Sequence, residues 1–405
     1  MTASRPNLLK LLAPLAAFGL AVALLLALGG PRELTPPERS SADYASLGYD
    51  YLQQARDNGD PANYSRAQRS FAAALRRDDH DVDALLGAAT LAGLRHDFQE
   101  QLRLGLEAQR LMPETVRAYP EIADAQIELG RYAAAERTLQ RMLDLKPNLS
   151  AYARVSFFRE LHGDLGGAAE AMRLAVSAGA GAPENVAYVQ VLLGDLELQR
   201  GRTGAARLAY ISALRSLPGY PAGLVGLARA DAAGGELGRA AVRLRRASDR
   251  LPLPATLVLL AEVERALGKD GAANGALAAA RAQQELLISG RVLPDAEAVI
   301  FEADHGSRAR AVTLGRRVWR AVPSVRSADA LGWALTRAGR PREGFSFARR
   351  ALRLGSRGPL FRLHAGLAAR EAGLAAPAAR HLAVAAEGGT ALSPRALHLL
   401  REGRR

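Results

Sequence analysis

The chain of 405 residues contains no cysteine. This absence excludes a disulfide framework, a thiolate metal site, a cysteine nucleophile and a lipid anchor attached to a thiol. Aromatic residues make up only 5% of the chain, and lysine occurs at just three positions, Lys10, Lys146 and Lys269. The chain is nevertheless 49% hydrophobic and 23% charged, which is not the composition of a disordered protein. It is long enough to build several packed layers.

The charge is unevenly distributed. Lysine and arginine together number 54 against 41 acidic residues, for a net charge of +13. The last hundred residues, 306–405, hold 20 arginines and only five acidic residues, a local excess of +15. A clustered positive field attracts nucleic acid, anionic lipid and acidic protein alike, so charge alone does not select the partner.

The N-terminus has the features of a targeting segment. Arg5 and Lys10 precede an uninterrupted run of apolar or small residues over 11–28, and Gly29, Gly30 and Pro31 end it. A helix of that length spans about 27 Å, close to the ~30 Å hydrocarbon core of a bilayer. We therefore predict a cytoplasmic n-region at 1–10, a transmembrane signal anchor at 11–30 and a proline-containing linker at 31–40.

The charge before this segment predicts a single-pass protein of the cell membrane, with a cytoplasmic N-terminus and an extracytoplasmic body. The alternative is a cleaved signal peptide and a secreted body, because Ala27 and Gly29 are small residues at the spacing that a signal peptidase accepts.

The rest of the chain is internally repetitive. Glycines recur at intervals of 33 to 38 residues, at positions 130, 163, 201, 235, 268, 306, 339 and 373. Around several of them a small, a large and a small residue and then a proline follow at offsets of 5, 9, 12 and 17, as in Ala206, Tyr210, Ala213 and Pro218 after Gly201. A large residue and a small one precede the glycine by eight and seven positions, as in Leu193 and Gly194.

This pattern predicts a pair of antiparallel helices in each unit. Glycine adopts the positive φ that ends the first helix, and proline ends the second because it lacks an amide hydrogen. Small residues mark the places where helices cross closely, since helix axes approach to 8–10 Å only where the side chains in contact are short.

The body resembles a tetratricopeptide repeat (TPR) array, with the period of about 34 residues, the small-large-small spacing and the closing proline of that family. The resemblance implies an all-α fold, a right-handed α-solenoid of stacked antiparallel helix pairs, over 41–390, followed by a basic C-terminal tail at 391–405. The second unit has His96 where the glycine is expected, and two longer units hold insertions near 177–183 and 282–293. We count nine or ten units. TPR proteins are mostly protein-binding scaffolds.

The sequence offers little evidence of catalysis. It has no glycine-lysine phosphate loop and no GxSxG motif. The densest group of metal-type ligands, between Asp78 and Asp83, falls between two predicted helices, where carboxylates cap the next helix. We predict a protein that is not an enzyme and has no cofactor or metal site.

The unit geometry predicts a partner-binding groove on the first helices, whose residues six and ten positions before the glycine point to the concave side. The predicted groove residues are Tyr188, Val191, Asp195, Val225, Arg229, Val258, Glu262 and Trp333. Three valines flanked by charged residues suit a protein or peptide segment. Trp333 is either a binding anchor or a core residue.

The arginines of the last units predict a second surface, on the second helices. This basic surface consists of Arg316, Arg317, Arg320, Arg349, Arg350 and Arg353, with Arg245 and Arg246 at equivalent positions further upstream. Our leading hypothesis is a membrane-anchored scaffold that binds a protein partner in the groove. The alternative is an adaptor for an anionic polymer or lipid surface through the arginines. Aromatic residues do not interleave with the arginines, which argues against nucleic acid. The sequence does not indicate the oligomeric state.

Overall fold

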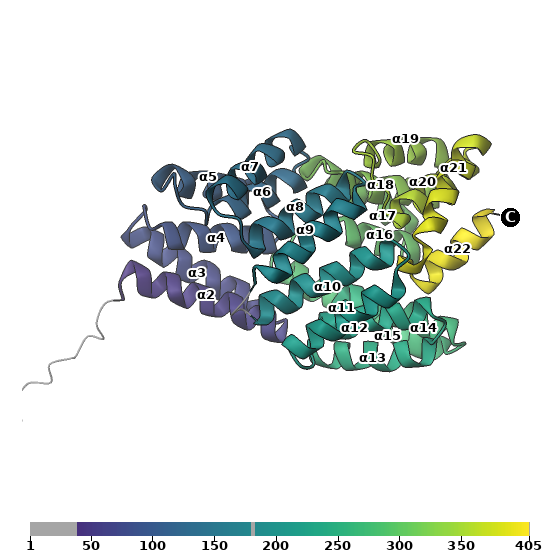
Figure 1. Cartoon of the computed structure of the whole chain (residues 1–405), viewed down its shortest axis with the longest axis horizontal. Helices are drawn as coiled ribbons and strands as arrows, with labels where there is room; N and C mark the ends of the chain where they lie inside the picture. The colour runs from purple at the N-terminus through teal and green to yellow at the C-terminus, as the bar shows by residue number, and fades with distance from the viewer. Residues whose placement is uncertain (1–38, 180–182, 405) are drawn as a thin grey trace, which may run out of the picture. The chain divides into compact units, whose positions relative to one another are not determined.

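The computed structural model describes residues 39–179 and 183–404, and the part from Ser41 onwards forms one compact unit (Figure 1). The described residues form 21 α-helices and one short 3₁₀ helix, with no strand among them, which confirms the prediction of an all-α fold. The predicted n-region, the anchor and the linker up to residue 38 lie outside the described residues. Between Ser41 and Arg404, every helix is too short or too polar to span a bilayer.

The helices form ten consecutive antiparallel pairs, in agreement with the predicted count of nine or ten. The first helices of the pairs are α2 (Ser41–Asn58), α4 (Val82–Leu94), α6 (Tyr119–Glu128), α8 (Leu149–Leu161), α10 (Pro183–Gln199), α12 (Pro221–Ala233), α14 (Pro254–Ala266), α16 (Ala296–His305), α18 (Val325–Arg337) and α20 (Pro359–Glu371). The second helices are α3 (Ala62–Arg77), α5 (Phe98–Leu111), α7 (Tyr132–Leu145), α9 (Leu165–Ser177), α11 (Thr203–Ser216), α13 (Leu237–Arg250), α15 (Asp270–Ser289), α17 (Arg308–Ala321), α19 (Pro341–Ala351) and α21 (Ala375–Glu387). Each helix packs against its partner, and consecutive pairs pack against one another.

The turn inside each pair is built as the spacing predicts, with one exception. Seven of the eight regularly spaced glycines have a positive φ, between 70° and 81°. His96 takes the same conformation in the second pair, with φ of 60°, at the position where glycine was missing. Gly306 is the exception, since its φ is −133°. There the turn is made differently, because the Ser307 side chain caps α17 by accepting a hydrogen bond from the Arg310 amide.

The small residues of the repeat leave the space that the large ones occupy. The buried ring of Tyr210 lies between Gly194 on its own first helix and Gly226 on the next, and a methyl group on either glycine would overlap the ring. Phe71 lies in the same way between Gly48 and Gly87. At Leu139 and Leu244, where the large residue is leucine, the position seven before the turn glycine holds alanine instead. Large and small side chains are therefore matched in size at these four crossings.

Within the unit the array turns back on itself. The turn inside each of the first five pairs contacts the loop that follows the pair five places later. The contacts join Gly59 to Leu251, His96 to Leu293, Gly130 to Pro323, Gly163 to Gly355, and Leu198 to Thr390. One superhelical turn of the array therefore takes between five and six pairs, and successive turns are in contact.

The insertion predicted near 282–293 contributes to this contact. Most of it extends α15 to Ser289, and the following loop meets the second pair. The Leu293 amide donates to the Arg95 carbonyl over 2.9 Å, and the His96 ring Nδ1 lies 2.8 Å from the Leu293 carbonyl oxygen. The left-handed backbone of His96 therefore sits at a contact between turns.

The predicted basic tail at 391–405 is folded over its described residues, 391–404. A 3₁₀ helix, η2 (Gly389–Ala391), leads into α22 (Pro394–Arg404), which packs against α14, α20 and α21. Ala396 and Leu400 of α22 are buried in the core of the last pairs. The described part of this segment is a capping helix, because the last pair would otherwise expose its apolar face.

Candidate partner-binding surfaces

The predicted groove is more closed than a row of first helices alone implies. Val191 is buried, and Val225 and Val258 are partly buried against the neighbouring helices. Tyr188 is the only predicted groove residue that is more than half exposed, at 51%. The three valines therefore do not form an open apolar strip, because adjacent first helices cover them.

Trp333 belongs to the core. It is 2% exposed, and its ring stacks on the ring of His364 with centroids 4.3 Å apart. Its indole Nε1 donates to the Asp304 carboxylate over 3.1 Å, and His364 pairs with buried Asp329. This network joins α16, α18 and α20. Of the two alternatives for Trp333, the observed packing matches the core residue.

The charged members of the predicted groove bind one another. Arg229 on α12 forms an ion pair with Asp195 on α10 at 2.8 Å, and Tyr210 donates its hydroxyl to the same carboxylate over 2.7 Å. The Asp195 charge raises the pKa of Arg229. Arg229 also donates to the Ala391 carbonyl of η2 over 3.4 Å. Glu262, further along, faces His305 at 3.7 Å.

A cavity of about 350 Å³ lies where the inner face meets the C-terminal segment. Glu160, Arg229 and Leu259 line it from α8, α12 and α14, while Leu360 and Phe361 line it from α20. Gln199 donates to Glu160 over 2.7 Å. Burial raises the pKa of Glu160, and the nearby Asp195 charge raises it further. The cavity combines an apolar wall with one acidic and one basic group.

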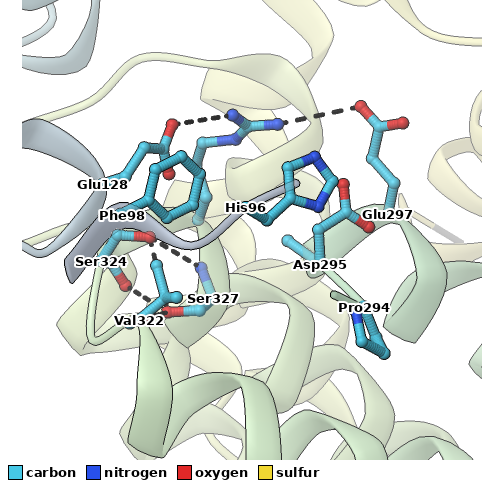
Figure 2. Close-up of a pocket in the computed structure, with 11 residues that line it drawn as sticks. His96, Phe98, Glu128, Pro294, Asp295, Glu297, Val322, Ser324 and Ser327 are labelled. Carbon is cyan, nitrogen blue, oxygen red and sulfur yellow. Dashed lines mark hydrogen bonds and ion pairs between the residues drawn. The ribbon is translucent and has the colours of Figure 1, made fainter. Parts of the chain in front are cut away.

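A second cavity, of about 270 Å³, lies at the contact between turns (Figure 2). Glu128 and Glu297 approach one guanidinium, that of Arg326, at 3.1 Å and 3.8 Å. His96 and Asp295 line the same space. Burial raises the pKa of Glu297, and the charge of Asp295 adds to this effect. The arrangement holds two superhelical turns together through Arg326.

The acidic cluster between α3 and α4 has the capping role that its position indicates. Asp81 accepts a hydrogen bond from the Ala84 amide over 2.9 Å and so caps α4. Asp78, Asp79 and His80 lie together beside it, all exposed. Exposed acidic groups of this kind are common in proteins without a bound metal.

The basic surface is exposed at all six of its arginines. The sequence reasoning missed a feature that bears on these arginines. Four consecutive pairs have a buried acidic residue four positions before the turn glycine. These residues are Glu197, Asp231, Glu264 and Glu302, none more than 5% exposed. Each forms ion pairs with arginines of the adjoining second helices, among them Arg173, Arg207 with Arg243, Arg245, and Arg281. The periodicity of these acids is visible in the sequence.

The last two pairs lose this acid. The equivalent positions hold Leu335 and Ala369, both buried. Arg316 and Arg349 occupy the position at which Arg245 reaches Glu264, but they have no buried carboxylate to bind. Arg316 has only an exposed partner, Glu343, at 3.4 Å. In the described part of the chain, Arg349 and Arg317 form no ion pair.

Comparison with known proteins supports the fold and leaves the function open. No family model matches the chain. A curated relative, the cellulose synthase 1 operon protein C of Komagataeibacter xylinus, is 29% identical over 214 residues, which is 52% of this chain and 13% of that protein. The chain therefore spans only a small part of that relative's length.

Among solved structures, the human IFIT1 dimer with m7Gppp-AAAA superposes with a TM-score of 0.53 at 16% identity, over 82% of this chain and 75% of that one. A monomeric IFIT1 mutant with Gppp-AAAA gives 0.51 at 15% identity over the same shares. These neighbours are TPR-like helical repeat proteins, so the chain has a TPR-like fold. Proteins of this type commonly act as protein-binding scaffolds.

Proposed function

We propose that the chain is a helical-repeat scaffold that binds a protein or peptide segment on the inner face of its right-handed superhelix and carries out no covalent chemistry. The proposal includes a membrane anchor at 11–30 that holds the repeat unit on the extracytoplasmic side. The chain then acts by bringing its partner to the membrane.

The cavity of about 350 Å³ carries the proposal. Arg229, a predicted groove residue, lies there beside the apolar side chains of Leu259, Leu360 and Phe361, and Leu360 is exposed. An apolar side chain of a partner would be buried against these three, while Arg229 and Glu160 would bind polar groups of its backbone. Such a combination of an apolar anchor and a few polar groups is typical of peptide-binding sites.

The charge of the first helices favours a protein over a phosphate-bearing ligand such as the m7Gppp-AAAA and Gppp-AAAA named with the similar IFIT1 structures. Carboxylates outnumber arginines around the two cavities and the adjoining inner positions. The acids are Glu121, Asp124, Glu128, Glu160, Asp195, Asp295 and Glu297, and the arginines are Arg154, Arg229 and Arg326. A surface with this balance repels phosphates.

Site-specific photo-crosslinking in the native cell tests the inner-face site. A photo-reactive residue in place of Leu360 should capture a discrete protein, and the same residue in place of Leu208 should not. Leu208 is the matched control because it is an exposed leucine on the outer helix α11. Identical crosslinked species from both positions, or none from Leu360, Leu259 and Phe361, would contradict the proposal.

Membrane extraction tests the anchor separately. The full chain should stay with the membrane fraction after alkaline carbonate treatment, and a chain lacking residues 1–40 should be released. Release of the full chain would rule out the anchor without affecting the inner-face site.

The alternative, an adaptor for an anionic polymer or lipid surface, uses the basic surface on α17 and α19. It is compatible with the first proposal because the two surfaces lie on different helices. The unpaired arginines of the last pairs favour it.

A further inference from the structure

We infer that the basic surface binds an anionic phospholipid bilayer by contacting lipid phosphates through Arg316, Arg317, Arg320, Arg349, Arg350 and Arg353. This inference goes beyond the proposed partner binding, since it uses a different surface and its test requires no partner. It adds a second membrane contact to a repeat unit that the sequence predicts to be tethered at its other end.

The arginines form two matching rows. Arg316, Arg317 and Arg320 on α17 have the same spacing in the sequence as Arg349 and Arg350 at the end of α19 and Arg353 in the turn that follows it. The helices α17 and α19 are the second helices of consecutive pairs. Neighbouring helices of this kind lie about 10 Å apart. The two rows therefore present a grid of guanidinium groups, which are rigid donors suited to phosphate oxygens.

The grid is not neutralised within the described structure. The helix α17 has five arginines and no acidic residue, and α19 has a single acid, Glu343. Arg350 and Arg353 contact only rings and backbone, over Phe347 at 4.7 Å and over Tyr132 at 5.2 Å. Two earlier pairs show the contrast, because there the arginine at the position of Arg349 is held by a buried carboxylate, Arg173 by Glu197 and Arg245 by Glu264.

The carboxylate is confined to the fifth to eighth pairs, so the last two pairs lack it, as the first four do. Leu335 and Ala369 replace the acid, and both are buried, so the core is kept while the internal counter-charge is lost. An exposed arginine with no partner gains nothing from folding by itself. The six exposed arginines, of which only Arg316 forms an ion pair in the described part of the chain, give a local field that attracts an anionic surface.

The surroundings of the grid favour lipid phosphates over nucleic acid or an acidic peptide. Trp319 packs edge-on against Phe347 at 5.6 Å, and Arg350 covers Phe347, so these rings are not offered for base stacking. The six arginines line neither of the two cavities described above, and a peptide would need such a depression to bury side chains. A bilayer requires neither bases nor a groove.

The predicted tether also favours a bilayer. The linker 31–40 follows the predicted anchor, and ten residues reach at most about 35 Å even when fully extended. A body held this close to a membrane meets lipid headgroups at a high effective concentration.

Residue-resolved arginine modification of the full chain tests the inference. The chain is treated with phenylglyoxal in the presence of phosphatidylcholine vesicles, or of vesicles that also contain phosphatidylglycerol, and each arginine is followed by mass spectrometry. The anionic vesicles should slow modification of Arg317 and Arg349 several-fold, and high salt should remove the protection. Arg137, Arg215 and Arg246 are internal controls, because they are exposed on other second helices and should react equally in both vesicles.

A pair of variants sharpens the test. Arg317→Glu with Arg349→Glu should abolish the lipid-dependent protection of Arg320 and Arg350, whereas Arg137→Glu with Arg246→Glu, an equal change of charge, should preserve it. Equal modification in the two kinds of vesicle overturns the inference, as does equal protection of the control arginines. Protection by polyuridylate in solution that exceeds protection by the anionic vesicles overturns the assignment to lipid. None of these outcomes affects the inner-face proposal.

Discussion

At the residue scale, the role of a charged side chain is set by the residue that faces it on the next helix. Arg245 and Arg349 occupy equivalent positions in their repeats, yet Arg245 binds buried Glu264 while Arg349 faces solvent. The same holds for aromatic residues, since Trp333 is buried on His364 and Tyr188 is exposed, although both lie on first helices. Burial and pairing therefore distinguish structural residues from those available to a partner.

Neutralising one of the buried acids should strongly destabilise the fold. Asp231 is 0% exposed and forms ion pairs of 2.7 Å with both Arg207 and Arg243. Asp231→Asn should lower the free energy of unfolding by about 3 kcal/mol, because it leaves two arginines without their counter-charge. Urea denaturation followed by circular dichroism measures the change. Glu343→Gln is the control, since its ion pairs are exposed and should contribute at most about 1 kcal/mol. Equal effects of the two substitutions would remove this role for Asp231.

The raised pKa of the Glu160 carboxyl group predicts that the stability of the fold depends on pH. Burial raises the pKa of Glu160 above the ordinary value of 4.5, so the folded chain holds this proton more tightly than the unfolded chain does. Stability from this group is then fully present below 4.5 and is lost as the pH rises through the folded pKa. Glu160→Gln should raise the melting temperature at neutral pH, and the difference should disappear in acid.

Thermal melts across the pH range check this prediction, with Glu136→Gln on the exposed face of α7 as the matched control. A Glu160→Gln variant that melts below the parent chain at neutral pH would show that the carboxylate is stabilising there.

At the element scale, helix pairing depends on matching large and small residues across each crossing. The turn glycines and the closing prolines end the helices, but the distance between helices is set by contacts such as Tyr210 with Gly194 and Gly226. A glycine in the middle of a helix weakens that helix by about 1 kcal/mol relative to alanine. Its presence in α12 is explained by the ring that it accommodates.

Gly226→Ala should therefore destabilise the chain, by about 1–3 kcal/mol, because the added methyl group overlaps the buried Tyr210 ring. Gly275→Ala should instead stabilise it by up to about 1 kcal/mol, since Gly275 lies in the middle of α15 with no atom within 4 Å of the added methyl group. Denaturation midpoints of the two variants should move in opposite directions. Shifts of the same sign would contradict the size-matching account of the glycines.

At the scale of the whole repeat unit, the contacts between superhelical turns close the inner face. The turn of each early pair meets the loop five pairs later, and η2 reaches the inner positions around Arg229. A partner therefore has access to the cavity beside Leu360 rather than to a continuous open groove. The arrangement makes distant pairs stabilise one another, unlike a solenoid in which each repeat contacts only its neighbours.

Substitutions at two turn glycines distinguish the effect of the contact between superhelical turns from the conformational cost of a positive φ. Gly130 and Gly373 have φ of 70° and 80°, so alanine at either position should cost about 1–2 kcal/mol. At Gly130 the added methyl group would also lie 2.5 Å from the Pro323 carbonyl oxygen, whereas Gly373 has open space. Gly130→Ala should thus lower the urea midpoint more than Gly373→Ala. Equal losses would indicate that the contact between turns contributes no stability.

The sequence by itself determined the helical hairpins, their number and most of their turns, because the glycine, the proline and the small-large-small spacing act within one unit and its immediate neighbour. It also indicated two distinct surfaces, and the basic one is exposed at all six predicted residues. These features depend on contacts between residues no more than about one repeat apart, which a periodic pattern records directly.

Only the tertiary structure decided which of the predicted groove residues face solvent. The position of Trp333 in the core and the pairing of Asp195 with Arg229 depend on which side chains face each other on consecutive first helices. The docking of η2 against Arg229 depends on where one superhelical turn meets the next. That meeting point is the sum of small rotations over five or six pairs, and no single repeat specifies it. The inner face is closed for this reason, while the arginines of the last pairs remain exposed because the internal acid that would bind them is absent from the facing helix.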